Sequence, residues 1–255
     1  MSSTSAIIVT FIFSIVFPIG LMIWWKKKTG EGIWSFAAGA ICFTVFAMIL
    51  ERLLHQAVLG GTSPLAQKIT ASPVLTMVYA ALMAGIFEET GRLFGFKVLL
   101  KDKKEPSTAI AYGIGHGGIE VILLLGMTYL SLLLAVLGVD FGNTAVNTAL
   151  LDSARSITFA TAAVAMLERI SAMMIHIGLS MVVFVAARGK KKLWLYPVAI
   201  LLHALADSAA ALYQYGLLTS LVTVEGFTFV MALICMAIGM LVLSKMEQPQ
   251  PPAQE

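Results

Sequence analysis

Charged side chains are scarce in this sequence, at 12% of its 255 residues. Soluble globular domains carry about 25% charged residues, so the scarcity excludes an ordinary water-soluble domain. Hydrophobic residues make up 59% of the chain, and its length suits one helical bundle rather than two domains. The composition therefore indicates a polytopic membrane protein.

Cysteine and sustained positive charge are lacking as well. The two cysteines, Cys42 and Cys235, lie in separate apolar runs, which excludes a disulfide framework and gives no support to a cysteine nucleophile. The net charge is only +3, and the basic residues form short clusters between apolar runs, so no nucleic-acid partner is indicated. The first run, from Ala6 to Trp25, lacks a basic leader and a clear cleavage site, so we expect a retained span.

The apolar runs provide seven crossings of a bilayer at about 20 residues each. The predicted spans are residues 6–25, 33–58, 73–100, 107–137, 157–187, 193–216 and 226–244. This pattern predicts an all-α transmembrane helix bundle, formed by a single domain over residues 1–247. We expect the proline-rich tail, residues 248–255, to be disordered and the connection 138–156 to be a solvated loop.

Basic residues follow every second span. They are Lys26, Lys27 and Lys28, then Lys101, Lys103 and Lys104, then Arg188, Lys190, Lys191 and Lys192, and finally Lys245. The opposite connections hold only Lys68 and Arg155. By the positive-inside rule, the N-terminus lies outside and the C-terminal tail is cytoplasmic. We expect a multi-pass protein of the cell membrane, surrounded by the lipid bilayer.

Ionisable residues inside the apolar runs are the strongest functional signal. The third run contains Glu88, Glu89 and Arg92, and an ionised group at that depth costs at least about 2.5–3.5 kcal/mol on insertion scales. Counted from the basic end of each span, at about 1.5 Å per residue, four residues reach a depth of roughly 15–18 Å. They are Glu88, His116, His176 and His203. Since scattered structural residues have no reason to share a level, we predict that they form a site.

Neighbouring polar residues are predicted to support this layer. We expect Arg92 to be a counter-ion for Glu88 or Glu89, and Glu89 to point about 100° away from Glu88 toward a different partner. Asp207, four residues after His203, can hold that histidine in one tautomer.

Two further groups follow from helical spacing. Tyr112, His116 and Glu120 recur at intervals of four and share a helix face, so Glu120 is either a supporting or a structural group. A second layer nearer the outer face is expected to form a structural network, consisting of Glu51, His55, Glu168, Arg52 and Arg169. The glycines near these residues are expected to let helices approach closely.

This set of residues can hydrolyse a peptide bond. A carboxylate near imidazoles in a low-dielectric pocket can deprotonate water, and a second histidine can stabilise an oxyanion. Glu88 with His116, His176 and His203 also forms a plausible zinc shell, although the sequence has no His-Glu-x-x-His motif. The cofactor is therefore either none or zinc.

Three short motifs carry a family resemblance. They are Glu88-Glu89-x-x-Arg92, Tyr112-x-x-x-His116 and His203-x-x-x-Asp207. In this order, on separate spans, they resemble the CAAX-type prenyl endopeptidase and bacteriocin-processing superfamily, and within it the YhfC-type intramembrane peptidases of bacteria. The chain differs in having two residues rather than three before Arg92, and aspartate rather than asparagine at Asp207.

The resemblance implies a bacterial plasma-membrane peptidase of eight helices or fewer. It implies that Glu88 and His116 activate a water molecule, and that His203 and Asp207 act on the oxyanion side. Glu89, Arg92, Tyr112, Glu120 and His176 would support them. Metal-free glutamate chemistry is favoured over a metal for this family.

The leading hypothesis is an intramembrane endopeptidase that cleaves a membrane protein or peptide, with a site that opens toward the cytoplasmic half. A proton-coupled transporter is a second hypothesis, because intramembrane histidines and carboxylates also form proton relays. A third is a non-catalytic binding or immunity protein that uses the same pocket. Loss of cleavage in Glu88→Gln separates the first hypothesis from the other two.

Overall fold

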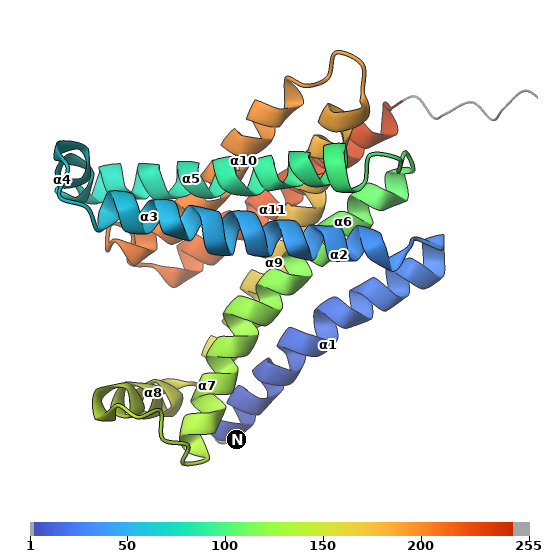
Figure 1. Ribbon diagram of the computed structural model, residues 1–255. Helices are drawn as coiled ribbons and strands as arrows, with labels where there is room; N and C mark the ends of the chain where they lie inside the picture. Colours follow the sequence, from blue (N-terminus) through green and yellow to red (C-terminus); the bar gives the residue numbers. More distant parts are fainter. Residues whose placement is uncertain (1–2, 247–255) are drawn as a thin grey trace, which may run out of the picture.

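The computed structural model describes residues 3–246, and every regular element in that range is a helix (Figure 1). The elements are α1 (Ser3–Thr29), α2 (Ile33–Phe43), η1 (Thr44–Glu51), α3 (Arg52–Leu59), α4 (Pro64–Thr70), α5 (Pro73–Phe94), η2 (Gly95–Leu99), α6 (Pro106–Glu120), η3 (Val121–Gly126), α7 (Met127–Val136), α8 (Thr144–Ser156), α9 (Phe159–Arg188), α10 (Leu195–Gln214) and α11 (Leu221–Ser244). The three η elements are π-helical and continue neighbouring α-helices.

Seven continuous helices in the described range are long and apolar enough to cross a membrane. They cover Ser3–Thr29, Ile33–Leu59, Pro73–Leu99, Pro106–Val136, Phe159–Arg188, Leu195–Gln214 and Leu221–Ser244. These helices coincide with the seven predicted spans, so the prediction of an all-α bundle is confirmed. The tail predicted to be disordered, residues 248–255, lies outside the described residues.

Two connections contain helices that the sequence did not suggest. The connection 138–156, predicted to be a solvated loop, is largely helix α8. The Asn143 side chain caps it by accepting hydrogen bonds from the Ala145 and Val146 backbone N–H groups, and Ala154 is buried against the bundle. Figure 1 shows α8 beside α7, near the start of α1. The loop prediction is therefore wrong for this segment. The shorter helix α4 lies between α3 and α5 and begins at the capping residue Ser63.

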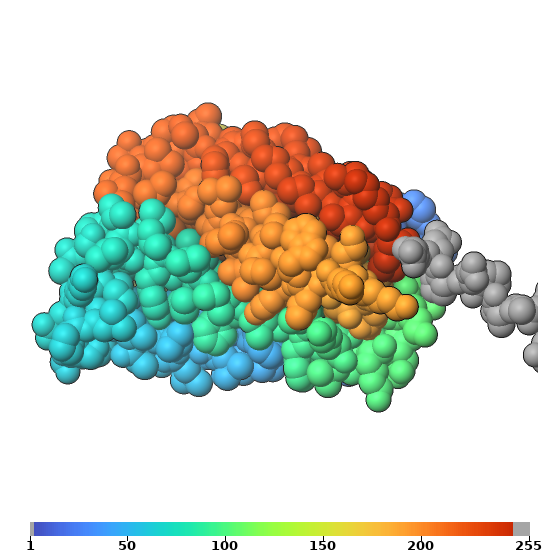
Figure 2. Space-filling view, turned by 90° about the horizontal axis from the view of Figure 1, so that it is seen from above, coloured from blue at the N-terminus to red at the C-terminus, as the bar shows by residue number. Residues whose placement is uncertain are grey.

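Helix α9 occupies the centre of the bundle. In its most apolar stretch 72% of the residues are buried, whereas no other span exceeds 33%. Its second half, from Ile175 to Ala186, packs in one core with Phe96 and Tyr112. Figure 2 shows α10 between α5 and α11 on the upper face, so these helices close around α9. Polar side chains on the inner faces of α5, α6 and α10 therefore meet those of α9.

Close contact between α2 and α6 depends on glycine. A Cβ atom at Gly115 would collide with the Phe36 carbonyl group, and one at Gly39 would lie 2.8 Å from the His116 backbone nitrogen. Small residues allow helix backbones to approach in this way. The predicted packing role of the α6 glycines is therefore visible at Gly115.

Glu31 joins three segments at the end of the bundle where the lysine-bearing connections lie, here called the basic end. Its carboxylate accepts hydrogen bonds from Ser35 (2.8 Å), Lys103 (3.0 Å), Ser107 (2.9 Å) and Thr108 (3.0 Å). Burial alone would raise the pKa of Glu31, but these four hydrogen bonds together lower it below its ordinary value of 4.5. The carboxylate thus ties the α1–α2 connection to the start of α6.

We predict that Gly115→Ala lowers the thermal stability of the purified protein, whereas Gly20→Ala does not. The added methyl group at residue 115 forces α2 and α6 apart, and overpacking of this kind costs about 1–3 kcal/mol. Gly20 in α1 is the matched control, because nothing lies within 4 Å of a Cβ atom built there. Equal unfolding temperatures for the two variants would contradict this account of the contact.

We predict that Glu31→Gln lowers the free energy of unfolding at neutral pH by about 1–3 kcal/mol, since it weakens hydrogen bonds to a charged acceptor. A folded-state pKa below the ordinary value stabilises the protein above that value, and the contribution is lost as the pH falls through the folded pKa. The difference from the unmutated protein should therefore shrink below pH 4.5. Unfolding in detergent at neutral pH and below pH 4.5 measures this difference in stability, and Asp102→Asn in the same region is the control. A difference that does not change with pH would refute the stabilising role of the Glu31 carboxylate.

Candidate active site

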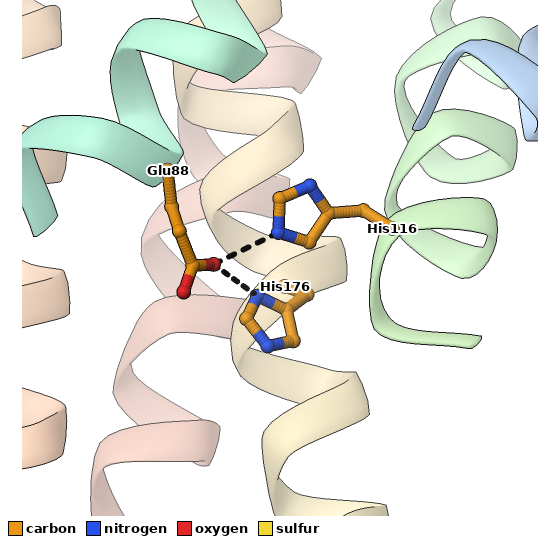
Figure 3. A group of neighbouring side chains, drawn as sticks. All are labelled: Glu88, His116 and His176. Atoms are coloured by element: carbon orange, nitrogen blue, oxygen red, sulfur yellow. Dashed lines mark hydrogen bonds and ion pairs between the residues drawn. The ribbon is translucent and has the colours of Figure 1, made fainter. Parts of the chain in front are cut away.

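One carboxylate oxygen in the middle of the bundle faces three histidines from three other helices. Glu88 on α5 places Oε2 2.9 Å from His116 Nε2 on α6, 3.9 Å from His176 Nδ1 on α9 and 3.8 Å from His203 Nε2 on α10. Figure 3 shows the first two histidines converging on this oxygen. All four residues are buried. The four residues that sequence depth places at one level therefore meet at Glu88.

Two further carboxylates hold histidine rings from behind. His203 Nδ1 lies 2.7 Å from Glu89 Oε1, and His176 Nε2 forms an ion pair with Glu120 Oε2. The other nitrogen of each ring, His203 Nε2 and His176 Nδ1, faces Glu88. A carboxylate behind a histidine fixes the ring's orientation and tautomer, and metal-binding histidines have such partners in most proteins.

Asp207 contacts His203, as its spacing of four residues suggests, and Glu89 contacts the other side of the same ring. Glu89 contacts Nδ1, and Asp207 Oδ2 lies 3.4 Å from Nε2. That is the same nitrogen that faces Glu88. The Asp207 side chain is 43% exposed, so it lies at the edge of the site.

Arg92 is fully buried and pairs mainly with Glu89. Its Nε lies 3.0 Å from Glu89 Oε2, whereas Nη2 is 4.0 Å from Glu88 Oε2. Nη1 donates hydrogen bonds to the His176 carbonyl oxygen (2.7 Å) and to Ser180 Oγ (2.8 Å). The shorter spacing after the glutamate pair therefore still turns Arg92 into the bundle. Ser180 is an anchor for Arg92, and its place on one helical stripe with His176 is the signal in the sequence that could have identified it.

Tyr112 and Glu120 each contact one of the histidines that surround Glu88. The Tyr112 hydroxyl donates to the Gly91 carbonyl oxygen at 3.3 Å, and its ring centre lies 6.1 Å from that of His116. Glu120 contacts His176 on one side and Arg169 Nη1 on the other, at 2.7 Å. Tyr112 therefore packs the site, whereas Glu120 connects it to an arginine.

The second polar layer is divided rather than continuous. Glu51 Oε1 contacts His55 Nε2 at 3.1 Å, and His55 Nδ1 contacts the Tyr79 hydroxyl at 3.2 Å. Glu168 pairs instead with Arg169 on α9, which joins the site through Glu120. Among the described residues no recorded bond connects the two groups, so the single network expected from sequence is wrong.

A cavity of about 350 Å³, here called the main cavity, leads to the site between α9, α10 and α11. It is lined at its inner end by Glu88, His176 and His203, and further out by Thr161 and Leu221, which begin α9 and α11. Those helix starts lie opposite the basic end. Beyond the site, the residues that line the main cavity lie in the halves of α9, α10 and α11 that are farther from the basic end. The prediction that the site opens toward the lysine-bearing side is therefore wrong.

Glu88, His116 and His176 are suited to hold a metal ion. Glu88 Oε2, His116 Nε2 and His176 Nδ1 lie within 4.8 Å of one another. Zinc takes carboxylate and imidazole ligands at about 2.0–2.2 Å, and two histidines with a glutamate leave an open position at catalytic sites. Arg92 Nη2 lies 3.4 Å from His116 Nε2 and 3.3 Å from His176 Nδ1. A cation held by these nitrogens would take the place of both contacts, while the ion pair of Arg92 Nε with Glu89 would remain. His203 falls outside this triad.

Comparison with known proteins finds one family and one relative that match most of the chain. A family described as YhfC intramembrane metalloprotease matches residues 13–228. The uncharacterized membrane protein YhfC of Bacillus subtilis (strain 168) is 36% identical over 218 residues, which cover 82% of this chain and 84% of that protein. No solved structure matches the chain.

We predict that the purified protein binds about one metal ion per chain and that His176→Ala abolishes the binding. Glu120→Gln should lower metal affinity about 10- to 100-fold, because it removes the carboxylate behind His176. His55→Ala is the matched control, since His55 is an intramembrane histidine whose recorded contacts are Glu51 and Tyr79. Elemental analysis and competition with a zinc indicator measure both effects. Equal loss of metal in the His55 and His176 variants would refute the assignment.

Proposed function

The chain belongs to the YhfC intramembrane metalloprotease family, and from this premise we propose that it is a zinc-dependent endopeptidase that cleaves a membrane-embedded protein or peptide. The observation that carries the proposal is the meeting of Glu88, His116 and His176 inside a membrane helix bundle, with a cavity leading to them. The family description favours the metal-containing alternative over the metal-free one that the sequence resemblance favoured.

Zinc is the metal that this ligand set fits best. Two imidazoles and one carboxylate are the ligands of several zinc hydrolases, and no thiolate lies among them. When bound, zinc polarises a carbonyl group and lowers the pKa of a water molecule. The Glu120 and Arg169 contacts behind His176 would keep that ligand in place as substrate enters.

Glu88 and His116 are the groups proposed to activate water. Glu88 Oε2 and His116 Nε2 belong to the set that would hold the metal, which leaves the second oxygen of Glu88, Oε1, to accept a proton from water. The water oxygen then attacks the carbonyl carbon of the peptide. When the carbon–nitrogen bond breaks, the same proton passes from Glu88 to the leaving amine.

His203 and Asp207 are proposed to act at the carbonyl oxygen. Both nitrogens of His203 face carboxylates, Nδ1 at Glu89 and Nε2 at Asp207 and Glu88. A protonated ring in this position can donate from Nε2 to the oxygen that gains charge. A fixed donor in a low-dielectric site stabilises such an oxyanion strongly.

The orientation is proposed from the lysine pattern. If the basic end faces the cytoplasm, the main cavity opens toward the outer half of a bacterial plasma membrane. A substrate helix would enter from the bilayer or from the outer face, beside α9 and α11.

We predict that Glu88→Gln lowers cleavage about 100- to 10,000-fold while the helix content and thermal stability stay unchanged, because it removes the proton acceptor. The assay reconstitutes the protein in liposomes with a mixed library of transmembrane peptides and identifies new termini by mass spectrometry. A chelator added to the same reaction should also stop cleavage, and zinc should restore it.

Glu105→Gln provides the control, because it makes the same substitution at an exposed glutamate between α5 and α6. It should cleave as the unmutated protein does. If Glu88→Gln and the unmutated protein produce the same termini, the peptidase proposal is wrong, and the carrier and binding hypotheses take its place.

A further inference from the structure

A second cavity reaches the site from the side opposite the main cavity. It has a volume of about 240 Å³ and lies between the helix formed by α2, η1 and α3 and the helices α5 and α6. We call it the side cavity. Glu88 and Glu120 line it at the site, and Ala47, Met48 and Glu51 line it on η1. Glu88 and Glu120 also line the main cavity, so the two cavities meet at the same carboxylates.

The side cavity is lined by four apolar residues and by five ionisable ones, namely Glu51, Arg52, His55, Glu88 and Glu120. Glu51 is only 7% exposed and contacts His55 at 3.1 Å, and His55 continues to the Tyr79 hydroxyl at 3.2 Å. Apolar cavities stay dry, whereas a roomy cavity with several polar partners holds water. The side cavity therefore has the volume and the partners to hold several water molecules beside Glu88.

Two π-helical segments lie next to carboxylates that line the side cavity. Glu51 is the last residue of the π-helix η1, and Glu120 directly precedes the π-helix η3. Single π-helical turns are rare and occur frequently at functional sites. Two of them in facing helices, each next to a carboxylate that lines one cavity, indicate that the cavity has a function.

Hydrolysis consumes one water molecule for each bond broken, and a site inside a membrane must obtain it without bulk solvent. A peptide bound in the main cavity displaces the water there. We propose that the side cavity is the water entrance, which supplies Glu88 from the η1 side while the main cavity holds the peptide. The role in catalysis rests on the proposed peptidase function, but the presence of water in the side cavity does not.

Thiol labelling tests whether the side cavity contains water. Met48→Cys, in a background with Cys42→Ala and Cys235→Ala, is treated in liposomes with a permanently charged methanethiosulfonate reagent. Leu50→Cys is the matched control, because Leu50 is two residues away and faces the surroundings of the bundle. Met48→Cys should react at least about tenfold faster, since only a hydrated thiol ionises readily. Adding Ala47→Phe should abolish the difference, and labelling no faster than at residue 50 overturns the proposal.

Kinetics test whether this water is the one consumed. Ala47→Phe fills the side cavity, whereas Val45→Phe enlarges a residue of the same helix that lines neither cavity. On a peptide that the unmutated protein cleaves, Ala47→Phe should lower kcat and leave KM unchanged, and Val45→Phe should change neither. An unchanged kcat in Ala47→Phe overturns the proposed entrance. Met48→Trp is a second filling variant if Ala47→Phe does not fold.

The two experiments separate this inference from the peptidase proposal. The labelling needs no substrate, so it decides whether the cavity is hydrated even when no peptide is cleaved. Cleavage by the unmutated protein together with slow labelling of Met48→Cys would retain the peptidase and reject the entrance. Fast labelling without cleavage by any variant would retain the hydrated cavity and reject the peptidase.

Discussion

The buried guanidinium of Arg92 sets the positions of the helices around the site. An ion without solvent carries a penalty of several kcal/mol unless partners surround it. Arg92 obtains them from Glu89 in its own helix and from Ser180 and the His176 carbonyl oxygen of α9. Glu89 in turn holds His203 of α10. One charge thus links α5, α9 and α10, and the histidines reach Glu88 because these three helices cannot shift independently.

The sequence predicted the seven spans and the shared depth of the central residues because both depend on local quantities. Apolar run length determines the spans, and the rise of a helix determines how deep Glu88, His116, His176 and His203 lie. Helix spacing also indicated that Glu89 has a partner other than Glu88, and that partner is His203. The catalytic roles of these residues stay predictions, since contact alone does not assign chemistry.

Other features depend on how helices pack, and the sequence does not determine that. Asp207 is four residues from His203 and contacts it, but the second carboxylate on that ring, Glu89, comes from another helix, and helix spacing did not identify which ring it contacts. The opening of the main cavity follows from the separation of α9, α10 and α11 toward the end opposite the lysines. Helix α8 forms because Asn143 caps it and the bundle buries Ala154, and neither contact has a strong periodic signal.

X-ray absorption at the zinc edge of the zinc-loaded protein in lipid nanodiscs tests the central claim most directly, namely that Glu88, His116 and His176 hold a metal ion. The account predicts a shell of nitrogen and oxygen ligands at about 2.0–2.2 Å, with outer scattering from two imidazoles. His176→Ala should remove one imidazole from that shell. A shell with sulfur at about 2.3 Å, or an unchanged imidazole count in His176→Ala, would contradict the account.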